Sequence, residues 1–382
     1  MPAQFLPLVV SAPSKVILHG EHAVVYGKTA VAASLDLRTR MTIKPHLTHV
    51  VVNFPDVGLS DCWTVDQLKE LFKHRPKDKI EDEVDLVYLD KIHDFLGTDQ
   101  SNLRMASVIC FLYLYSVMVS PDIITMEIQV ESEIPLGAGL GSSAALSVCL
   151  SAGLTGVLHQ VKSLEKNIFN HLSNTAKKDV CRLAFLSEKI LHGTPSGIDN
   201  SVSTYGGLCK FSDGVLTPLP TTSTLSILLV NTNVERNTKD LVNKVRVKFD
   251  SHPKIIKPVL ESIDGVSEAF LALLENMGSS NSTATYREME ELIDYNQALL
   301  QSLGVNHPAL QDICNTVRQF GMHGKLTGAG GGGFAFALVP PNIPEKSIEL
   351  ARQTLEGAGY TCCSTQVGGA GVRISIQEND PV

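Results

Sequence analysis

Several features that mark common classes of protein are missing from this sequence. Its eight cysteines contain no CxxC pair, and the adjacent Cys362 and Cys363 suit neither a usual disulfide nor a zinc site. Basic residues are not in excess: 32 lysines and arginines stand against 40 aspartates and glutamates, for a net charge of −8. Nonspecific nucleic-acid binding depends on a basic surface. We therefore expect reduced thiols and no nucleic-acid partner, and an anionic ligand must find positive charge locally.

Long apolar runs and address signals are also absent. The longest apolar run, residues 108–119 (VICFLYLYSVMV), is shorter than the roughly 20 residues of a membrane-spanning helix and carries two tyrosines. The first residues, MPAQFLPLVV, lack the basic segment and cleavage site of a signal peptide. The twelve histidines form no HxxxH or HExxH cluster, which argues against a transition-metal site. These absences predict a cytoplasmic protein with no membrane partner.

The overall composition is that of a globular protein. The 382 residues are 43% hydrophobic and 19% charged, which suits a substantial core, and the length allows two domains. No tandem repeat or low-complexity linker interrupts the chain. We place a domain boundary near residue 224, so that residues 1–224 form one domain and 225–382 the other. The mixture of helical and strand-like segments predicts the α+β class.

Hydrophobic periodicity predicts the order of the elements. Residues 5–20 hold two apolar runs separated by SAPS, which predicts two short strands and a turn. Residues 23–35 predict a buried strand and the start of a helix, and the charged stretch 61–100 predicts helix or loop at the surface. Further predicted elements are helices at 104–119, 178–192 (ending at Gly193), three within 252–320 and one at 346–359, and strands at 124–131, 225–230, 334–339 and 371–377.

Three glycine-containing stretches are candidates for binding phosphate. Residues 20–29, GEHAVVYGKT, end like a Walker A loop, but His22 stands where GxxxxGK[ST] requires glycine. Residues 328–333, GAGGGG, satisfy GxGxxG, but a strand-like segment follows where a dinucleotide-binding loop would open a helix. We interpret that stretch as a turn where one backbone approaches another backbone or a ligand closely.

The third stretch, PLGAGLGSSAA at residues 135–145, lies between the predicted strand 124–131 and an apolar helix. This order directs free backbone N–H groups and the positive end of the helix dipole at an anion. Ser142 and Ser143 stand where the helix begins, and the alternative is that serine caps the helix and binds nothing. The density of glycine exceeds what a cap requires, so the stretch is a candidate phosphate loop.

These stretches resemble the three motifs of the GHMP small-molecule kinases, a family named for galactokinase, homoserine kinase, mevalonate kinase and phosphomevalonate kinase. PLGAGLGSSAA resembles the family's PxxxGLGSSAA phosphate loop, SAPSKVILHGEHAVVYGK its first motif and KLTGAGGGGFA its third. The motifs occur in the family's order and together span residues 11–334. GEHAVVYGK and HGTPSGIDNSVSTYGG are most similar to the mevalonate kinase branch.

The resemblance implies a fold and a reaction. The fold is a mixed α/β N-terminal domain, residues 1–224, carrying the ATP phosphate loop, and a ferredoxin-like α+β C-terminal domain, residues 225–382. The reaction is ATP-dependent phosphorylation of the C5 hydroxyl of (R)-mevalonate to 5-phosphomevalonate and ADP, with Mg²⁺, in isoprenoid and sterol biosynthesis. It also implies a homodimer, and prenyl diphosphates as feedback inhibitors that compete with ATP.

The resemblance further implies roles for individual residues. Asp199 in SGIDN matches the catalytic base, although Asp-Asn in a loop also makes Asx turns. Lys15 in APSKVI matches a cation that lowers the pKa of the reacting hydroxyl and stabilises the transferred phosphoryl group. Ser143 and Glu188 match the magnesium ligands. The implied ATP-binding residues are Gly137, Ala138, Gly139, Gly141, Ser142 and Ser143.

The mevalonate site is implied to include Glu21, His22, Ser196 and Thr238. Lys325 and residues 328–333 are expected to shape the interface between the domains near substrate and phosphate.

Two positions depart from the family motifs. Ser14 stands where the first motif usually has glycine, so a positive φ there would strain the backbone. Leu136 stands where a second proline is frequent. Two alternatives stay open from the sequence: another GHMP kinase, such as a phosphomevalonate or galactose kinase, or a non-catalytic ligand-binding relative of the fold.

Overall fold

The computed structural model describes residues 5–76, 83–98, 105–119, 122–135, 139–162, 172–219, 224–277 and 283–377. The helices are α1 (Val65–Phe72), α2 (Leu86–Leu96), α3 (Ala106–Val119), α4 (Ser142–Val161), α5 (Asn174–His192), α6 (Ile198–Tyr205), α7 (Thr238–Ser251), α8 (Pro253–Asn276), α9 (Thr283–Leu303), α10 (Pro308–Gln319) and α11 (Glu345–Gly357), with 3₁₀ turns η1 (Ala23–Tyr26) and η2 (Pro55–Val57). The strands are β1 (Leu8–His19), β2 (Ala30–Pro45), β3 (His49–Phe54), β4 (Leu59–Thr64), β5 (Met126–Ser132), β6 (Leu208–Ser212), β7 (Val215–Pro218), β8 (Leu225–Asn231), β9 (His323–Leu326), β10 (Phe334–Leu338), β11 (Thr361–Val367) and β12 (Arg373–Ile376).

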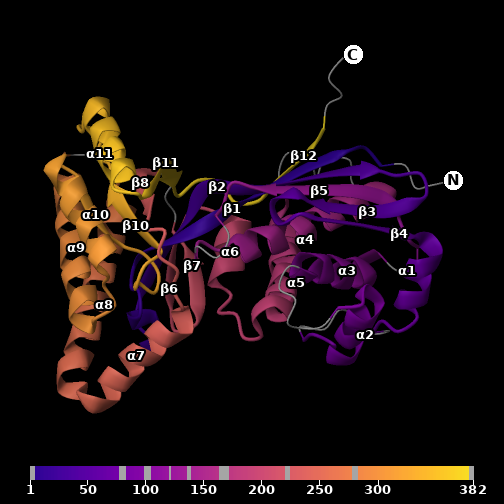
Figure 1. Ribbon diagram of the computed structural model, residues 1–382, viewed down its shortest axis with the longest axis horizontal. Helices are drawn as coiled ribbons and strands as arrows, with labels where there is room; N and C mark the ends of the chain where they lie inside the picture. Colours follow the sequence, from indigo (N-terminus) through magenta and orange to yellow (C-terminus); the bar gives the residue numbers. More distant parts are fainter. Residues whose placement is uncertain are drawn as a thin grey trace.

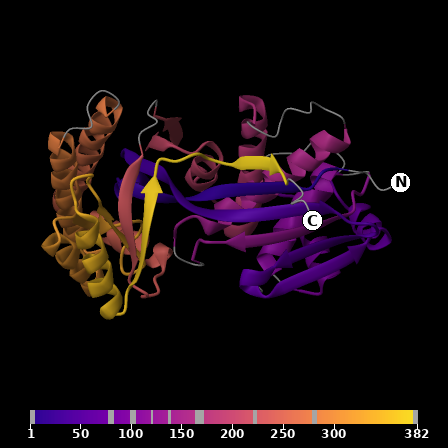
Figure 2. The same ribbon diagram turned by 90° about the horizontal axis from the view of Figure 1, so that it is seen from above.

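Within the described residues, twelve strands form one continuous mixed sheet. The main path runs β4-β3-β5-β2-β11-β8-β10-β9, and β12, β1, β6 and β7 pair beside it. The antiparallel pair of β1 and β2 extends through the middle of the molecule from one lobe toward the other (Figure 2). The N-terminal lobe has helices α1 to α6 on one side of its strands, and α8 to α11 cover the sheet at the opposite end (Figure 1). The predicted α+β class is confirmed.

Helix α4 is the central support of the N-terminal lobe. Thirteen of its twenty residues are buried, and it packs against β1, β2 and α5. A Cβ at Gly153 would lie 2.3 Å from the Cε of Met41, so a larger residue there would displace the side chains of β2 against which the helix packs. By length and composition α4 could cross a membrane, but 72% of its apolar window is buried within the protein, which makes this weak evidence for a membrane span. The packing fixes the start of α4 beneath the end of β1, where the site lies.

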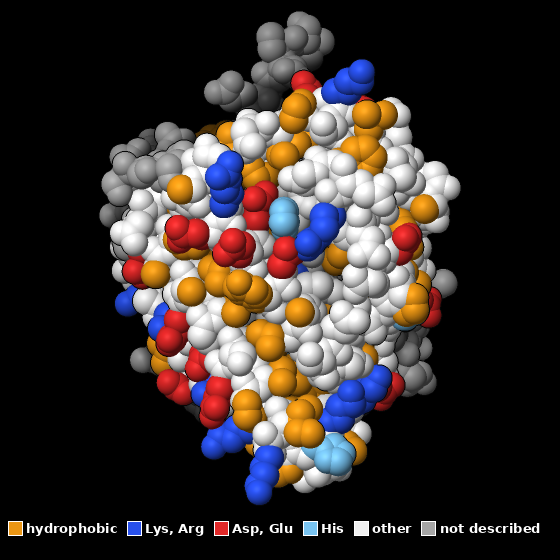
Figure 3. Space-filling model, turned by 90° about the vertical axis from the view of Figure 1, so that its left-hand side faces the viewer, with side chains coloured by type: hydrophobic (Ala, Val, Ile, Leu, Met, Phe, Trp, Pro, Cys, Tyr) orange, Lys and Arg blue, Asp and Glu red, His pale blue; other side chains and the backbone are white. Residues whose placement is uncertain are grey.

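The C-terminal lobe has its own core, formed between β8, β9, β10 and the helices that cover them. The outer face of this end carries side chains of both charge signs mixed with small hydrophobic groups (Figure 3).

After the C-terminal lobe, strand β12 returns to the N-terminal lobe and pairs with β1, with Leu8 opposite Ile376. The predicted boundary near residue 224 lies directly before β8 and stays a prediction, because strands from both halves share one sheet.

Several predicted elements agree with the structure, and three do not. Residues 8–19 form one long strand rather than two strands and a turn: the register with β2 shifts between Pro13 and Ser14, and this bulge accommodates the proline without breaking the pairing. Residues 23–35 contain the turn η1 and then strand β2, with no helix start. The stretch 61–100 is not confined to the surface, because α1 and α2 bury one apolar face each.

Candidate active site

Lys15 and Asp199 meet where β1, α4 and α6 come together. The Nζ of Lys15 lies 3.3 Å from Oδ1 of Asp199, and the side chains are 12% and 33% exposed. The backbone N–H of Lys15 donates to the carbonyl of Leu140 at 2.9 Å, which ties the strand to the candidate phosphate loop. Gly141 has a φ of +78°, and a Cβ there would lie 3.1 Å from the Cγ of Lys15. Glycine at 141 is therefore required both by the backbone conformation and by the space that Lys15 occupies.

The start of α4 has the form of an anion site. Gly141 is the N-cap residue, and no side chain caps the helix. Ser142 and Ser143 are its first residues, inside the helix, so the capping interpretation of the two serines does not apply. Uncapped N–H groups at a helix N-terminus and the positive end of the dipole attract phosphate. Gly139 and Gly141 both have positive φ, whereas Gly137, Ala138 and Leu136 lie outside the described residues.

Glu188 on α5 reaches the same helix start. The Oγ of Ser143 donates to Oε2 of Glu188 at 3.3 Å, and the Oγ of Ser147 donates to Oε1 at 3.3 Å. The Glu188 residue is only 4% exposed. Burial, and next the charge of Asp199, raises the pKa of Glu188 to about 7. His192 lies beside this pair, with Nε2 3.0 Å from the Oγ of Ser143.

This set of oxygen donors fits Mg²⁺. Magnesium takes one or two carboxylates, keeps water and phosphate oxygens, and favours hard oxygen donors. The Glu188 carboxylate and the Ser143 hydroxyl supply such donors, 3.3 Å apart, at the end of the helix that faces the candidate phosphate loop. A divalent cation beside Glu188 would offset the two effects that raise its pKa, namely burial and the nearby charge of Asp199.

Arg236 is a functional candidate that the sequence did not identify. It lies between two glycine stretches: a Cβ at Gly139 would come within 2.1 Å of its Nη2, and one at Gly333 within 2.7 Å of its Nε. Its Nη1 donates to the carbonyl of Thr327 at 3.3 Å. The sequence contained one general indication of such a residue: in a protein with a net charge of −8, an anion site needs cationic side chains nearby. Nothing in the spacing of VERNTKD distinguished this arginine from the neighbouring lysine.

Glu21 and His22 follow β1 and are both buried. Oε1 of Glu21 accepts a hydrogen bond from the Nζ of Lys325, and Oε2 accepts from Nδ2 of Asn296 at 3.1 Å. Burial raises the pKa of Glu21 and lowers that of Lys325, and each partner opposes the shift of the other. His22 has a φ of +61°, and its Nε2 lies 2.8 Å from the carbonyl oxygen of Ala329.

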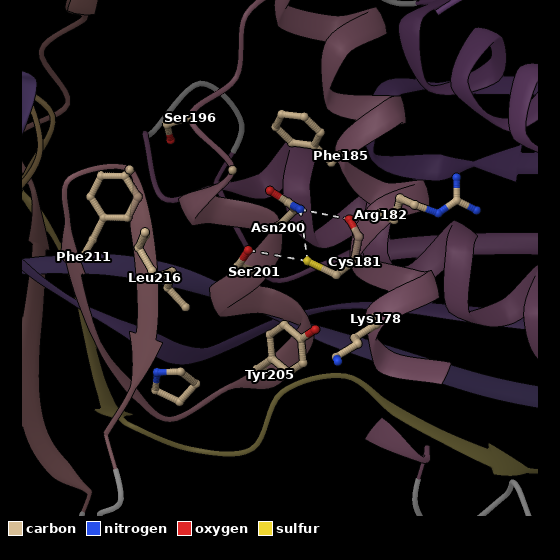
Figure 4. Close-up of a pocket in the computed structure, with 14 residues that line it drawn as sticks. Lys178, Cys181, Arg182, Phe185, Ser196, Asn200, Ser201, Tyr205, Phe211 and Leu216 are labelled. Carbon is tan, nitrogen blue, oxygen red and sulfur yellow. Dashed lines mark hydrogen bonds between the residues drawn. The ribbon is translucent and has the colours of Figure 1, made fainter. Parts of the chain in front are cut away.

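The remaining predicted substrate residues lie at the periphery. Thr238 is exposed at the first position of α7, next to the N-cap residue Asn237. Ser196 is exposed, and its Oγ accepts from the N–H of Ile198 at 3.4 Å. Ser196 also lines a cavity of about 680 Å³ between α5, α6 and the β6–β7 hairpin (Figure 4). Asp199 does not line this cavity.

Figure 4 also shows how α6 is held in place. Asn200 and Ser201 point from α6 toward Cys181 on α5, and Nδ2 of Asn200 donates to the carbonyl of Cys181 at 3.0 Å. Asp199 is the neighbour of this anchored Asn200. The position of the carboxylate opposite Lys15 is therefore fixed by contacts on the other side of the same helix.

The Ser14 position does not require the glycine that the related motif usually has. Ser14 lies within β1 and is absent from the residues with positive φ among those described. Its side chain is buried, and its Oγ has no hydrogen-bond partner among the described residues.

Comparison with known proteins places this geometry in a family. Residues 107–207 match the GHMP kinases N terminal domain and residues 273–371 the GHMP kinases C terminal domain. The chain is 40% identical to the mevalonate kinase of Mus musculus over 96% of its own length and 94% of that protein. Solved structures share the fold: the mevalonate kinase of Methanococcus jannaschii (TM-score 0.71, 22% identity, 94% and 98% of the two chains) and that of L. major in complex with R-mevalonate (TM-score 0.68, 22% identity, 94% and 96%). The chain belongs to the mevalonate kinases within the GHMP kinase family.

Proposed function

We propose that this protein transfers the γ-phosphoryl group of ATP to the C5 hydroxyl of (R)-mevalonate, giving 5-phosphomevalonate and ADP, with Asp199 and Lys15 as its catalytic residues. The observation that carries these assignments is the Lys15–Asp199 pair, 3.3 Å apart and partly open to solvent, directly beside the uncapped start of α4. A base, a cation and a phosphate cradle are the parts that phosphoryl transfer to an alcohol requires.

Each group has a distinct task in this scheme. Asp199 accepts the proton of the attacking hydroxyl, which a carboxylate within hydrogen-bond reach can do. Lys15 stabilises the negative charge of the phosphoryl group in transit. The N–H groups at the start of α4, with Gly139, Gly141, Ser142 and Ser143, hold the phosphates of ATP, and Arg236 supplies positive charge from the other lobe.

Ser143 and Glu188 would hold Mg²⁺, which when bound neutralises phosphate charge and orients the transferred group. His22, Ser196 and Thr238 are proposed to contact mevalonate. The magnesium role is supported by the Ser143–Glu188 contact. The mevalonate contacts are proposed on the similarity to the family, which includes the L. major relative whose structure holds R-mevalonate.

Several further properties are proposed on the similarity to the family. The protein acts in isoprenoid and sterol biosynthesis in the cytoplasm, as a homodimer, without a nucleic-acid or membrane partner. Prenyl diphosphates compete with ATP, because they are anions that fit a phosphate cradle. An inhibition pattern independent of ATP concentration would contradict this last proposal.

A coupled ADP-release assay tests the activity. The purified protein is supplied with Mg·ATP and, separately, mevalonate, phosphomevalonate and galactose, and product is identified by mass spectrometry. We expect ADP release that depends on mevalonate and that falls in Asp199→Ala. Release with galactose or phosphomevalonate but not with mevalonate would favour another GHMP kinase. No release with any of the three acceptors, with ligand binding retained, would favour the non-catalytic alternative.

A further inference from the structure

A closed cluster of polar side chains includes Glu21, the residue before His22. Its members are Glu21 after β1, Lys325 on β9, Asn296 on α9 and His19 at the end of β1. The side chains of Glu21 and Lys325 are 0% exposed. The Nζ of Lys325 lies 5.2 Å from the ring centroid of Phe336 and donates also to the carbonyl of Leu326 at 2.7 Å. The cluster therefore joins the two halves of the chain in an interior with no access for a ligand.

Both oxygens of the Glu21 carboxylate already have donors within this cluster. Lys325 donates to Oε1, and Asn296 donates to Oε2 at 3.1 Å. The same amide nitrogen lies 3.2 Å from Nδ1 of His19, so Asn296 links Glu21 to the strand that carries Lys15. The side chains of Glu21 and Lys325 are 0% exposed, so a substrate could reach this carboxylate only if the packing around it opened. The geometry disfavours direct contact with substrate.

The residue that follows Glu21 is held in an unusual conformation. His22 is not glycine yet has a φ of +61°, and such a backbone persists only where its surroundings hold it. On one side it follows Glu21, and on the other its ring bonds the carbonyl of Ala329 in the glycine turn of the C-terminal lobe. Turn η1 begins directly after it. The buried cluster and the Ala329 contact together determine where the imidazole points.

We propose that Glu21, Lys325 and Asn296 are positioning residues, which fix the strained His22 turn so that its imidazole meets mevalonate, and that Glu21 does not touch the substrate. The proposal rests on the proposed function for the identity of the substrate. It assigns a task to Lys325 and Asn296, which lie 304 and 275 positions from Glu21 in the chain.

The experiment compares Glu21→Gln, Lys325→Met, Asn296→Ala and the double variant Glu21→Gln/Lys325→Met. Removing one partner leaves the other buried and unpaired, whereas removing both leaves a neutral pair of similar volume. We expect each charge-removing single variant to raise the KM for mevalonate about tenfold or more, with the KM for ATP within about twofold. The double variant should recover at least part of that loss, and Asn296→Ala should have the same KM pattern with a smaller decrease in Tm.

A second readout does not depend on activity. Amide hydrogen exchange of the peptide 19–27, measured by mass spectrometry, reports the turn itself, whose internal bonds include Val24 N–H to Gly20 O at 3.1 Å. We expect lost protection in Lys325→Met and recovered protection in the double variant. If the wild type fails to phosphorylate mevalonate, the proposed function is wrong, while the exchange result still decides the role of the cluster.

Lys28→Met is the matched control. Lys28 also pairs across the two halves, with Asp264 on α8 at 3.3 Å, but its side chain is partly exposed and makes no bond to Glu21, Lys325 or Asn296 among the described residues. This variant should leave the KM for mevalonate unchanged. The proposal is overturned if Glu21→Gln raises the KM while Lys325→Met retains wild-type KM and wild-type exchange, because Glu21 would then act by direct contact. A double variant whose losses are the product of the two single losses would also overturn it.

Discussion

Two lysine–carboxylate pairs near the centre of this molecule have the same charges and opposite surroundings. Lys15 and Asp199 are partly exposed and lie 3.3 Å apart, whereas Lys325 and Glu21 are completely buried. The first pair lies beside the uncapped start of α4, and because it is partly exposed, either side chain can leave its partner and bind a ligand instead. The second pair is enclosed by Asn296, Phe336 and the backbone of Leu326. Exposure, rather than residue type, distinguishes the pair proposed as catalytic from the pair proposed as positioning.

The difference also has an energetic side. An exposed ion pair contributes on the order of 1 kcal/mol or less to stability, because water screens both charges. A buried pair adds little net stability either, but removing one partner is costly because the other charge stays in the interior. The open pair should therefore be sensitive in catalysis, and the closed pair in folding.

The largest effect is expected when the open pair is broken. Asp199→Asn removes the base, and Lys15→Met removes the cation, so each should lower kcat by about 10³-fold or more, equivalent to about 4 kcal/mol. Because both side chains are partly exposed, the Tm should change little. Steady-state ADP release and thermal unfolding on the same preparations measure both quantities. Near-normal turnover in either variant would remove that residue from the mechanism.

The next largest effect is the difference in the free energy of unfolding between Lys325→Met and Lys15→Met. Lys325→Met leaves Glu21 buried without its cation and should lower the free energy of unfolding by about 3–5 kcal/mol, against about 1 kcal/mol or less for Lys15→Met. Urea unfolding followed by circular dichroism gives both values. Equal losses in the two variants would show that the contrast in burial does not govern their stability.

A third effect concerns Glu188, the carboxylate at the edge of the open site. Its folded pKa is raised from 4.5 to about 7, so its contribution to stability is present below pH 4.5 and is lost as pH rises through 7. In metal-free protein, Glu188→Gln should therefore be more stable than wild type at pH 8, by up to about 3 kcal/mol. The two should converge near pH 5. Tm measured with EDTA across this range checks the sign, and a difference independent of pH would contradict the assigned cause.

The smallest effect is expected from Arg236, the cation that reaches the open site from the other lobe. Arg236→Lys keeps the charge but loses the planar guanidinium that fits between the glycine stretches. We expect kcat/KM for ATP to fall about tenfold, or about 1.4 kcal/mol, with unchanged Tm. Arg352→Lys, on the exposed face of α11, is the control. Equal kinetics in both variants would exclude a phosphate role for Arg236.

The sequence predicted the parts of the fold whose signal is local. Helix α3 and strand β5 were predictable because one is apolar throughout and the other alternates. The continuity of β1 was not, since a proline usually interrupts a ladder and only the pairing with β2 shows that a bulge absorbs it. Strand β11 was missed because most of TCCSTQV is not buried, so its membership in the sheet depends on the pairing with β8.

The residues of the candidate site also fall into two groups: those that motif resemblance could name and those that it could not. Lys15, Ser143, Glu188 and Asp199 could be named from motif resemblance, and the structure brings their side chains to one helix start. Arg236 and Asn296 could not, because their partners are distant in the chain: Thr327 lies 91 positions from Arg236, and Glu21 lies 275 positions from Asn296. Glu21 was predicted to line the mevalonate site, but its carboxylate is buried against Lys325 and Asn296. A motif does not reveal whether a carboxylate faces a ligand or the interior.

The return of β12 to the N-terminal lobe has a consequence for how the protein is made. Strand β1 is made before the other strands of the described sheet, yet one of its edges is completed only by residues 373–376. Until those residues are made, the N-terminal lobe presents an unpaired strand edge, the kind of surface that recruits chaperones or neighbouring chains. The strand that carries Lys15 therefore gains its last partner only when β12 has been synthesised.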